Sequence, residues 1–202
     1  MPRASRRQAL AHGLAWMAGI GAVRVVHGRS QRGLDQFLAP VPPCKDDKVT
    51  PAVSPDAAYR PEAPARTSLA GPRGAGERVV VAGYVIGVKC GRIKGARVDF
   101  WQADASGAYP KTGFDLRGHQ ITDAEGRYRL ETVRPGATPG RARHLVARVE
   151  PPGQPALTTA LYFPDDPDHD RDRFFTPSLL MRPVGGAPPG TSAYAFDFIL
   201  DL

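Results

Sequence analysis

The sequence predicts an all-β protein, an antiparallel β-sandwich with an extended N-terminal arm. The 202 residues include 22 glycines and 21 prolines, a composition that indicates many turns between short elements. From residue 77 onward, six or more short runs rich in β-branched and aromatic residues are bounded by Gly or Pro. Within several runs apolar and polar residues alternate, which is typical of strands with one face in a core. Such strands favour a sandwich, and the length suits a single domain.

The first two predicted strands are residues 78–86 (RVVVAGYVI) and 97–103 (RVDFWQA). Residues 91–95 lie between them with a glycine at each end, and they predict a hairpin connection. Because successive strand residues point to opposite faces, the second run has two distinct sides. Val98, Phe100 and Gln102 lie on one side, and Asp99 and Trp101 on the other.

The later strands are predicted at residues 127–133, 144–150, 157–163 and 193–200. A turn at residues 123–126 (DAEG) precedes the first of these, and residues 134–136 (RPG) end it. The next two are joined across residues 151–153 (PPG). A weak signal for a helical turn covers residues 178–182. In the last strand one face carries Tyr194, Phe196, Phe198 and Leu200.

The basic N-terminal segment predicts export. Residues 1–28 contain four arginines and no acid, and the pair Arg6-Arg7 precedes a weakly apolar stretch. This pattern resembles a bacterial twin-arginine export signal, and its apolar part is too short for a stable spanning helix. Removing these four arginines lowers the formal net charge from +7 to +3. A mature protein of that charge, with no basic stripe interleaved with aromatics, is expected to bind neither nucleic acid nor membrane.

Residues 29–76 are rich in Pro, Ala, Arg and Asp, and they predict a linker and arm before a sandwich domain at residues 77–202. The chain has only two cysteines, Cys44 in this arm and Cys90 after the first strand. In an exported protein such a pair predicts one disulfide, which stabilises by a few kcal/mol. Two unpaired thiols are the alternative, because spacing alone does not bring two backbones together.

Three motifs carry a family resemblance: residues 96–109 (ARVDFWQADASGAY), residues 117–132 (RGHQITDAEGRYRLET) and Leu161-Tyr162-Phe163. Together they resemble the intradiol ring-cleavage dioxygenases over roughly residues 50–200. The resemblance implies a β-sandwich enzyme that cleaves a catechol between its hydroxyls with O2. It also implies ferric iron held by two tyrosines and two histidines, a small aromatic diol as substrate, and a homo- or hetero-oligomer.

The resemblance assigns three residues of this chain to the site. Tyr109 matches the first tyrosinate ligand and His144 the first histidine, so these two are the candidate metal ligands. A tyrosinate oxygen is a hard, anionic donor suited to ferric iron. Arg141 matches the arginine that in the family stabilises charge on the substrate, which makes it the catalytic candidate.

The two remaining ligand positions have changed. Thr138 stands at the second tyrosine position, and Val146 at the second histidine of the family's His-x-His motif. Because alternate strand residues face one side, both imidazoles of that motif point at one metal, whereas a valine cannot donate. Ala160 replaces the glutamine of the family's TQLYF strand. Two protein donors are fewer than the three of open catalytic sites, so weak iron binding, or its loss, is expected.

Two weaker candidates lie elsewhere in the sequence. His119, in the RGHQ segment, is a candidate substitute ligand, and the alternative is a histidine of a surface loop. A stretch of acids after the TALYF strand lacks the spacing of an EF-hand, so a solvated loop is expected there rather than a cation site. It consists of Asp165, Asp166, Asp168, His169 and Asp170.

Two functions follow from these residues. One is a dioxygenase with an altered iron shell, in which Tyr109 and His144 hold the metal. The other is a non-catalytic sandwich, kept as a binding module or as the silent partner of an active homologue. The resemblance offers a precedent for the second, because one of the two related subunits of protocatechuate-type enzymes lacks iron. A sandwich without dioxygenase ancestry is disfavoured by the motifs.

Overall fold

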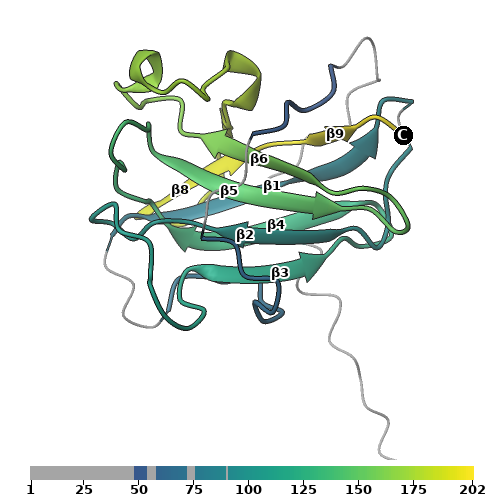
Figure 1. Ribbon diagram of the computed structural model, residues 1–202, viewed down its shortest axis with the longest axis horizontal. Helices are drawn as coiled ribbons and strands as arrows, with labels where there is room; N and C mark the ends of the chain where they lie inside the picture. The colour runs from purple at the N-terminus through teal and green to yellow at the C-terminus, as the bar shows by residue number, and fades with distance from the viewer. Residues whose placement is uncertain (1–47, 54–57, 72–75, 90) are drawn as a thin grey trace, which may run out of the picture.

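The computed structural model describes residues 48–53, 58–71, 76–89 and 91–202. The described chain folds into two β-sheets packed face to face, with two short 3₁₀ turns, η1 and η2 (Figure 1). Among the described residues, no helix has the length and apolar character needed to cross a membrane. The elements are β1 Arg78–Gly87, β2 Arg97–Trp101, β3 Arg117–Ile121, β4 Arg127–Val133, β5 His144–Glu150, β6 Leu157–Tyr162, η1 His169–Arg171, η2 Pro177–Leu179, β7 Arg182–Pro183, β8 Thr191–Ala195 and β9 Phe198–Leu200.

The predicted sandwich is confirmed. One sheet has the order β3-β2-β5-β6 and is antiparallel throughout. The other has the order β4-β1-β8-β7, with β9 also paired to β1. In this sheet β1 runs parallel to β8 and to β9, which departs from the predicted antiparallel pattern. The β1–β4 and β7–β8 pairs are antiparallel, as predicted. The β5–β6 hairpin forms as predicted, and β4 and β5 have the predicted bounds.

The core lies between the two sheets and is rich in aromatic rings. Phe100 of β2, Tyr128 of β4 and Phe198 of β9 form a cluster with ring centroids between 5.2 and 6.4 Å apart. The phenol of Tyr128 is buried there, and its hydroxyl donates to the carbonyl of Phe196 at 2.8 Å. This contact satisfies a polar group that burial would otherwise leave costly. The two sheets are thereby joined by rings from three different strands.

Two predictions about connections are corrected. Residues 91–95 do not form a hairpin between β1 and β2, because these strands lie in different sheets and β1 pairs with β4. Instead the segment folds back locally, and Ile93 N–H donates to the carbonyl of Val85 at 2.9 Å. The strand predicted at 193–200 is broken into β8 and β9, since the side chain of Asp197 accepts the Tyr84 N–H at 2.9 Å. Its alternate aromatic and leucine side chains still lie in the core.

The N-terminal arm follows the edge strands of both sheets where it is described. Ala65 forms a bridge with His119 of β3, and Ser68 forms one with Glu131 of β4. Arg117 of β3 anchors the arm: its side chain is buried and its Nε donates to the Ala58 carbonyl at 3.1 Å. The predicted export signal at residues 1–28 and the cysteines Cys44 and Cys90 lie outside the described residues.

Candidate functional site

The loop that carries Tyr109 is held by Asp104. One oxygen of this carboxylate accepts the N–H groups of Ser106 and Ala108 at 2.8 and 3.0 Å. Gly107 has a φ of 88°, and a Cβ there would lie 2.1 Å from the carbonyl oxygen of Ala137. Only glycine therefore fits, and the Tyr109 loop packs directly on the segment that leads to Thr138.

Tyr109 and His144 are brought together, as the resemblance implied. His144 is the first residue of β5 and is 3 % exposed, and its Nε2 lies 3.3 Å from the Tyr109 hydroxyl oxygen. Its Nδ1 lies 2.7 Å from the carbonyl oxygen of Ala142. Because a carbonyl only accepts, Nδ1 carries the proton and Nε2 presents a lone pair toward Tyr109. This is the tautomer in which a histidine can bind a metal through Nε2.

Arg141 lies beside this pair and is already engaged. Its Nε donates to the carboxylate of Asp172 at 2.8 Å, and its Nη2 donates to the Tyr162 hydroxyl at 2.9 Å. The guanidinium also lies over the ring of Phe174, 4.6 Å from the ring centroid. The side chain of Asp172 is fully buried. The positive charge of Arg141 is therefore compensated within the protein.

The pKa values around Arg141 follow from these contacts. Burial raises the pKa of Tyr162 to about 12, although the hydrogen bond from Arg141 opposes the rise. Burial alone would also raise the pKa of Asp172, but the hydrogen bonds from Arg141 and from the Phe174 N–H outweigh it and lower that pKa. At neutral pH the group is thus a neutral tyrosine beside an arginine–aspartate ion pair.

The changed positions lie next to the surviving pair. Val146 is two residues along β5 from His144, is 4 % exposed, and lies opposite Trp101 on β2 and Ala160 on β6. The peptide N–H of Arg141 donates to the carbonyl of Thr138 at 3.0 Å. The face that carries two imidazoles in the family's motif thus holds one imidazole and an apolar patch.

The donor set does not fit a four-ligand ferric centre. Tyr109 Oη and His144 Nε2 are two donors, and Val146 supplies none at the neighbouring position of the same face. Within the part of the chain that is described, no group of three or more His, Cys, Asp or Glu side chains is arranged to hold a metal ion. Two donors bind a metal far more weakly than three or four.

His119 is not placed with this pair. Its Nδ1 lies 2.7 Å from the carbonyl oxygen of Ala63 in the arm, and its cross-strand partner is Asp99. In the next strand Asp99 pairs with Arg148, which is four residues along β5 from His144. The strand spacings place His119 on the order of 15 Å from His144. The ring contributes to holding the arm.

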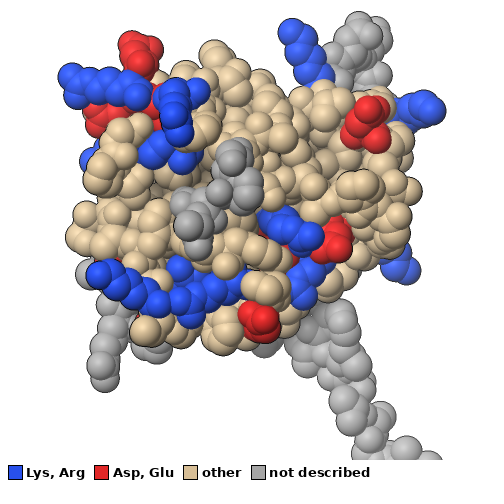
Figure 2. Space-filling view, in the orientation of Figure 1, with Lys and Arg blue, Asp and Glu red and all other residues tan. Residues whose placement is uncertain are grey.

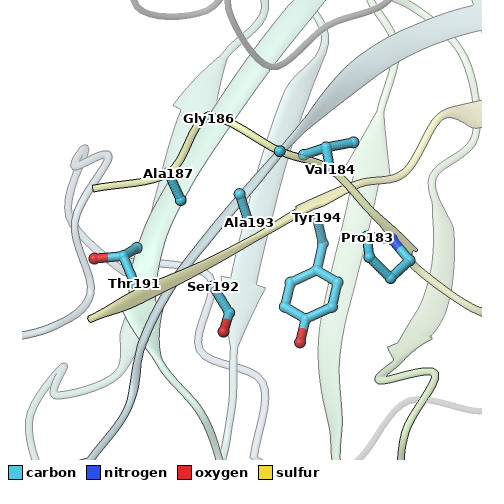
Figure 3. Close-up of a pocket in the computed structure, with 9 residues that line it drawn as sticks. Pro183, Val184, Gly186, Ala187, Thr191, Ser192, Ala193 and Tyr194 are labelled. Carbon is cyan, nitrogen blue, oxygen red and sulfur yellow. The ribbon is translucent and has the colours of Figure 1, made fainter. Parts of the chain in front are cut away.

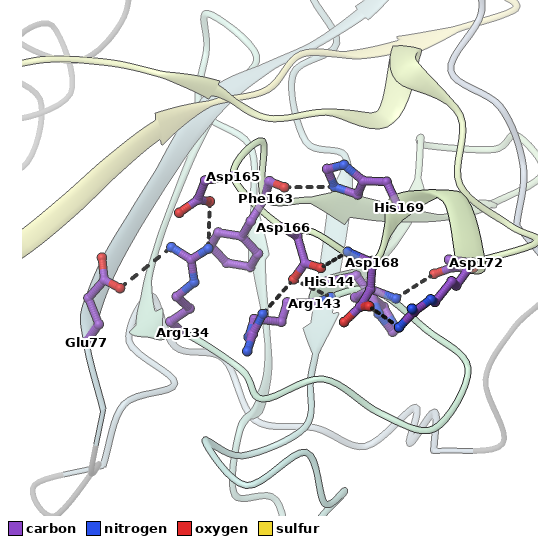
Figure 4. A network of polar contacts seen from close by, with 12 residues as sticks. Glu77, Arg134, Arg143, His144, Phe163, Asp165, Asp166, Asp168, His169 and Asp172 are labelled. Atoms are coloured by element: carbon purple, nitrogen blue, oxygen red, sulfur yellow. Dashed lines mark hydrogen bonds and ion pairs between the residues drawn. The ribbon is translucent and has the colours of Figure 1, made fainter.

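The acidic segment after β6 is more buried than its sequence indicated. Asp166 is 5 % exposed and binds Arg143, and the Asp165 carboxylate accepts a hydrogen bond from Arg134 at 2.6 Å. Figure 4 shows these carboxylates facing arginines rather than one another. The expectation of a solvated loop is therefore wrong for Asp166, because the sequence does not reveal which arginines it meets. Asp172, which follows this segment by two residues, was missed as a partner of Arg141 for the same reason.

A shallow depression of about 320 Å³ lies elsewhere, between β7 and β8 (Figure 3). Its lining includes Pro183, Ala187, Ser192 and Tyr194, and none of its residues belongs to the predicted site. On the face drawn in Figure 2, basic side chains form a row along the lower edge, and a cluster of basic and acidic side chains lies at the upper left. The depression therefore contributes no residue to the group formed by Tyr109, Arg141 and His144.

Comparison with known proteins places this geometry in context. The sequence model of a family described as dioxygenase matches residues 50–201. The chain is 32 % identical over 155 residues to the protocatechuate 3,4-dioxygenase beta chain of Burkholderia cepacia, an alignment that covers 62 % of this chain and 65 % of that one. It is 30 % identical over 126 residues to a hydroxyquinol 1,2-dioxygenase of a Rhizobium species, with 50 % and 43 % covered. The chain thus spans less than two thirds of these relatives.

Solved structures give the same result for the fold. The dioxygenase domain of a dioxygenase and carbohydrate-binding fusion from Streptomyces sp. SirexAA-E is 42 % identical, with a TM-score of 0.73 over 77 % of this chain and 99 % of that one. An intradiol ring-cleavage dioxygenase from Tetranychus urticae is 22 % identical, with a TM-score of 0.69 over 77 % and 96 % of the two chains. At 22 % identity, the likeness to the Tetranychus urticae protein shows only a shared β-sandwich fold.

Proposed function

The chain belongs to the intradiol ring-cleavage dioxygenase family, and on that basis we propose that it binds a small aromatic diol without the family's standard ferric ring cleavage. The observation that carries this proposal is Val146. It occupies the second histidine position of the motif on β5, beside His144, and is 4 % exposed. A valine side chain has no atom that can bind iron.

The retained polar groups suit a neutral diol. The Tyr109 hydroxyl and His144 Nε2 contact each other at 3.3 Å, and a diol that replaces this contact would meet a donor and an acceptor for its phenolic hydroxyls. Arg141 is paired with Asp172, so its charge attracts an anionic catecholate less than an unpaired arginine would. Ferric iron is the family's cofactor and would supply activation of the diol toward O2. The two donors left here are too few to hold it firmly.

Metal and oxygen measurements test this proposal directly. The protein should be produced with its export signal intact and purified without chelators. We expect iron well below one atom per chain and no O2 uptake on catechol or hydroxyquinol. Calorimetry should still record saturable binding of catechol, weakened by Tyr109→Phe and retained in Tyr59→Phe. The Tyr59 ring is tilted against that of Trp101, with ring centroids 5.1 Å apart. Stoichiometric iron together with O2 uptake would refute the proposal.

A second candidate function is that of a silent subunit. The similarity to a protein named as the beta chain of protocatechuate 3,4-dioxygenase supports assembly with a further chain, because that name implies one, and the valine at position 146 supports the silent role. In this case the chain would co-purify with an iron-containing homologue when both are produced in the native host. Size-exclusion chromatography with mass spectrometry distinguishes this assembly from a chain that binds its ligand alone.

We also propose export and a Cys44–Cys90 disulfide, which the sequence of residues 1–28 and the pair of cysteines support. Replacing Arg6 and Arg7 by lysine should retain the precursor in the cytoplasm. Mass spectrometry of the exported protein without reduction should find the two thiols linked. A mature protein with two alkylatable thiols would exclude the disulfide while leaving export intact.

A further inference from the structure

The peptide unit that joins Ala142 to Arg143 lies between a buried carboxylate and the His144 ring. Its N–H, which belongs to Arg143, donates to the carboxylate of Asp166 at 3.1 Å. Its carbonyl, which belongs to Ala142, lies 2.7 Å from His144 Nδ1. The two ends of one amide group are thus engaged at the same time. His144 Nε2 then lies 3.3 Å from the Tyr109 hydroxyl.

We propose that Asp166 is a positioning residue for His144, acting through a hydrogen-bond chain that runs from its carboxylate across the Ala142–Arg143 peptide to the imidazole and on to Tyr109. A charged acceptor at an amide N–H polarises the amide, and its carbonyl becomes a stronger acceptor. A stronger acceptor holds the proton on Nδ1 and increases the electron density at Nε2. The inference rests on the proposed function in one respect: no metal lies between His144 Nε2 and the Tyr109 hydroxyl.

The surroundings of Asp166 keep its carboxylate ionised and fixed. Its side chain is fully buried, and its second oxygen accepts the N–H of Asp168 at 2.9 Å (Figure 4). Burial alone would raise its pKa, but this bond and those from the N–H and guanidinium of Arg143 lower it. The Arg143 side chain is 35 % exposed, so water screens the charge of its guanidinium, 3.0 Å from the carboxylate. The hydrogen bond from the peptide N–H to the same oxygen, at 3.1 Å, is directional.

The fold contains two matched controls. Asp172 is as buried as Asp166 and also binds an arginine, but it accepts the N–H of Ala142, at 3.2 Å. That N–H belongs to the preceding peptide unit, whose carbonyl is that of Arg141. His119 supplies the second control. Its Nδ1 is also 2.7 Å from a carbonyl, that of Ala63, but the next residue is Pro64 and this peptide has no N–H to polarise.

Nitrogen-15 NMR of the histidines tests the chain of bonds. Iron is measured first, which tests the proposed function by itself, and the full-length protein is then dialysed against a chelator. The His144 signal is assigned with His144→Gln. In the wild type we expect a proton on Nδ1 and none on Nε2, with the Nδ1 proton further downfield than that of His119. Asp166→Asn should move this proton upfield and populate the Nε2-protonated tautomer, whereas Asp172→Asn should not.

Two results would overturn the inference. One is an identical His144 spectrum in the Asp166→Asn and Asp172→Asn variants. The other is a wild-type His144 proton at the same shift as that of His119. The second comparison needs no substitution, so it decides the matter even if Asp166→Asn does not fold. Neither result depends on the iron content, so failure of this inference is distinguishable from failure of the proposed function.

Discussion

Val146 and Ala160 are direct cross-strand partners on β5 and β6, so the two apolar replacements lie side by side. Directly opposite residues of an antiparallel pair have Cβ atoms about 5 Å apart. A glutamine at position 160 would therefore extend toward whatever occupies position 146. Once a valine stands there, a buried amide loses its partner and costs stability, whereas alanine does not. An alanine at position 160 is thus the residue we expect to be more stable beside Val146.

Restoring the missing donors should restore iron binding. We expect Thr138→Tyr with Val146→His to raise the ferric-iron affinity by more than about 100-fold, because each lost ligand contributes more than the 10–100-fold effect of an outer-sphere partner. Iron per chain after dialysis, measured by mass spectrometry, checks this. Adding Ala160→Gln to these two substitutions should raise the ferric-iron affinity further. The control is Thr138→Phe with Val146→Leu, which adds bulk without donors, and equal iron in both variants would show that the positions are wrongly assigned.

The Tyr109 loop should tolerate no side chain at Gly107. A Cβ there would meet the Ala137 carbonyl at 2.1 Å, a backbone atom that cannot move without the Thr138 segment. We expect Gly107→Ala to lower the free energy of unfolding by more than about 3 kcal/mol, from the clash and the left-handed backbone together. Urea unfolding of the wild type and the variant measures this loss of stability.

Gly113 provides the control for that substitution. It also has a positive φ, 64°, but a Cβ at this position would have no neighbouring atom within 4 Å. Gly113→Ala should cost only about 1 kcal/mol, the intrinsic penalty of the left-handed region. If the two variants were equally stable, the contact between the Tyr109 loop and the Thr138 segment would not be the reason for glycine at position 107.

The strands that the sequence predicted are those with alternation, such as β4, or with a run rich in β-branched and aromatic residues, such as β1. β3 was missed because RGHQI has no apolar alternation and contains Gly118. Its extended form comes from pairing with β2 and the arm, where a Cβ on Gly118 would lie 2.5 Å from the Arg66 side chain. Long-range contacts of this kind override local preference. The break between β8 and β9 has the same origin, a side chain of Asp197 that replaces a strand partner.

The sequence predicted only those site residues that belong to a recognisable family motif. The proximity of Tyr109 to His144 follows from the family resemblance, across 35 residues of sequence. Asp166 and Asp172 stand 23 and 31 residues after the arginines they bind, in a segment without periodicity. Nothing local distinguishes their carboxylates from solvated ones. Their roles appear only when the loop folds back over the start of β5.

Arg117 should be needed for the arm and for the Tyr109 loop together. Its buried guanidinium donates to the carbonyls of Ala58, Asp115 and Pro110 at 3.1 to 3.2 Å. A lysine has a single nitrogen and cannot reach all three, so buried acceptors are left unpaired. We expect Arg117→Lys to lower the free energy of unfolding by about 2–4 kcal/mol. Urea unfolding and the rate of proteolysis within the arm both report it.

Arg60→Lys is the matched control for Arg117→Lys. Arg60 also donates to two carbonyls, those of Lys111 and Gly113, but these bonds lie at the exposed surface. Water can replace them, so the loss should stay below about 1 kcal/mol. Equal losses for the two substitutions would mean that burial of the Arg117 guanidinium has no energetic importance.

The buried carboxylates should make the fold sensitive to acid. The pKa values of Asp166 and Asp172 lie below the ordinary 3.8, because hydrogen bonds to N–H groups and arginines outweigh burial. A lowered folded-state pKa gives stability that is complete above the unfolded-state pKa and is lost as the pH falls through the folded-state value. Replacing both by asparagine should therefore cost about 3 kcal/mol at pH 7, a cost that shrinks below pH 3.8.

Urea unfolding at a series of pH values measures this difference between the wild type and the Asp166→Asn, Asp172→Asn variant. Above about pH 5 the difference should be constant, since both carboxyls are ionised in the folded and the unfolded chain. Below the unfolded-state pKa the difference in the free energy of unfolding should narrow. Asp166 and Asp172 of the wild type then become protonated, and the fold stabilises only their charged form. Asp170→Asn, on the same loop, controls for a general change of charge. A difference that widens toward low pH would mean that folding raises these two pKa values, and the ion pairs with Arg141 and Arg143 would then not hold the loop over β5.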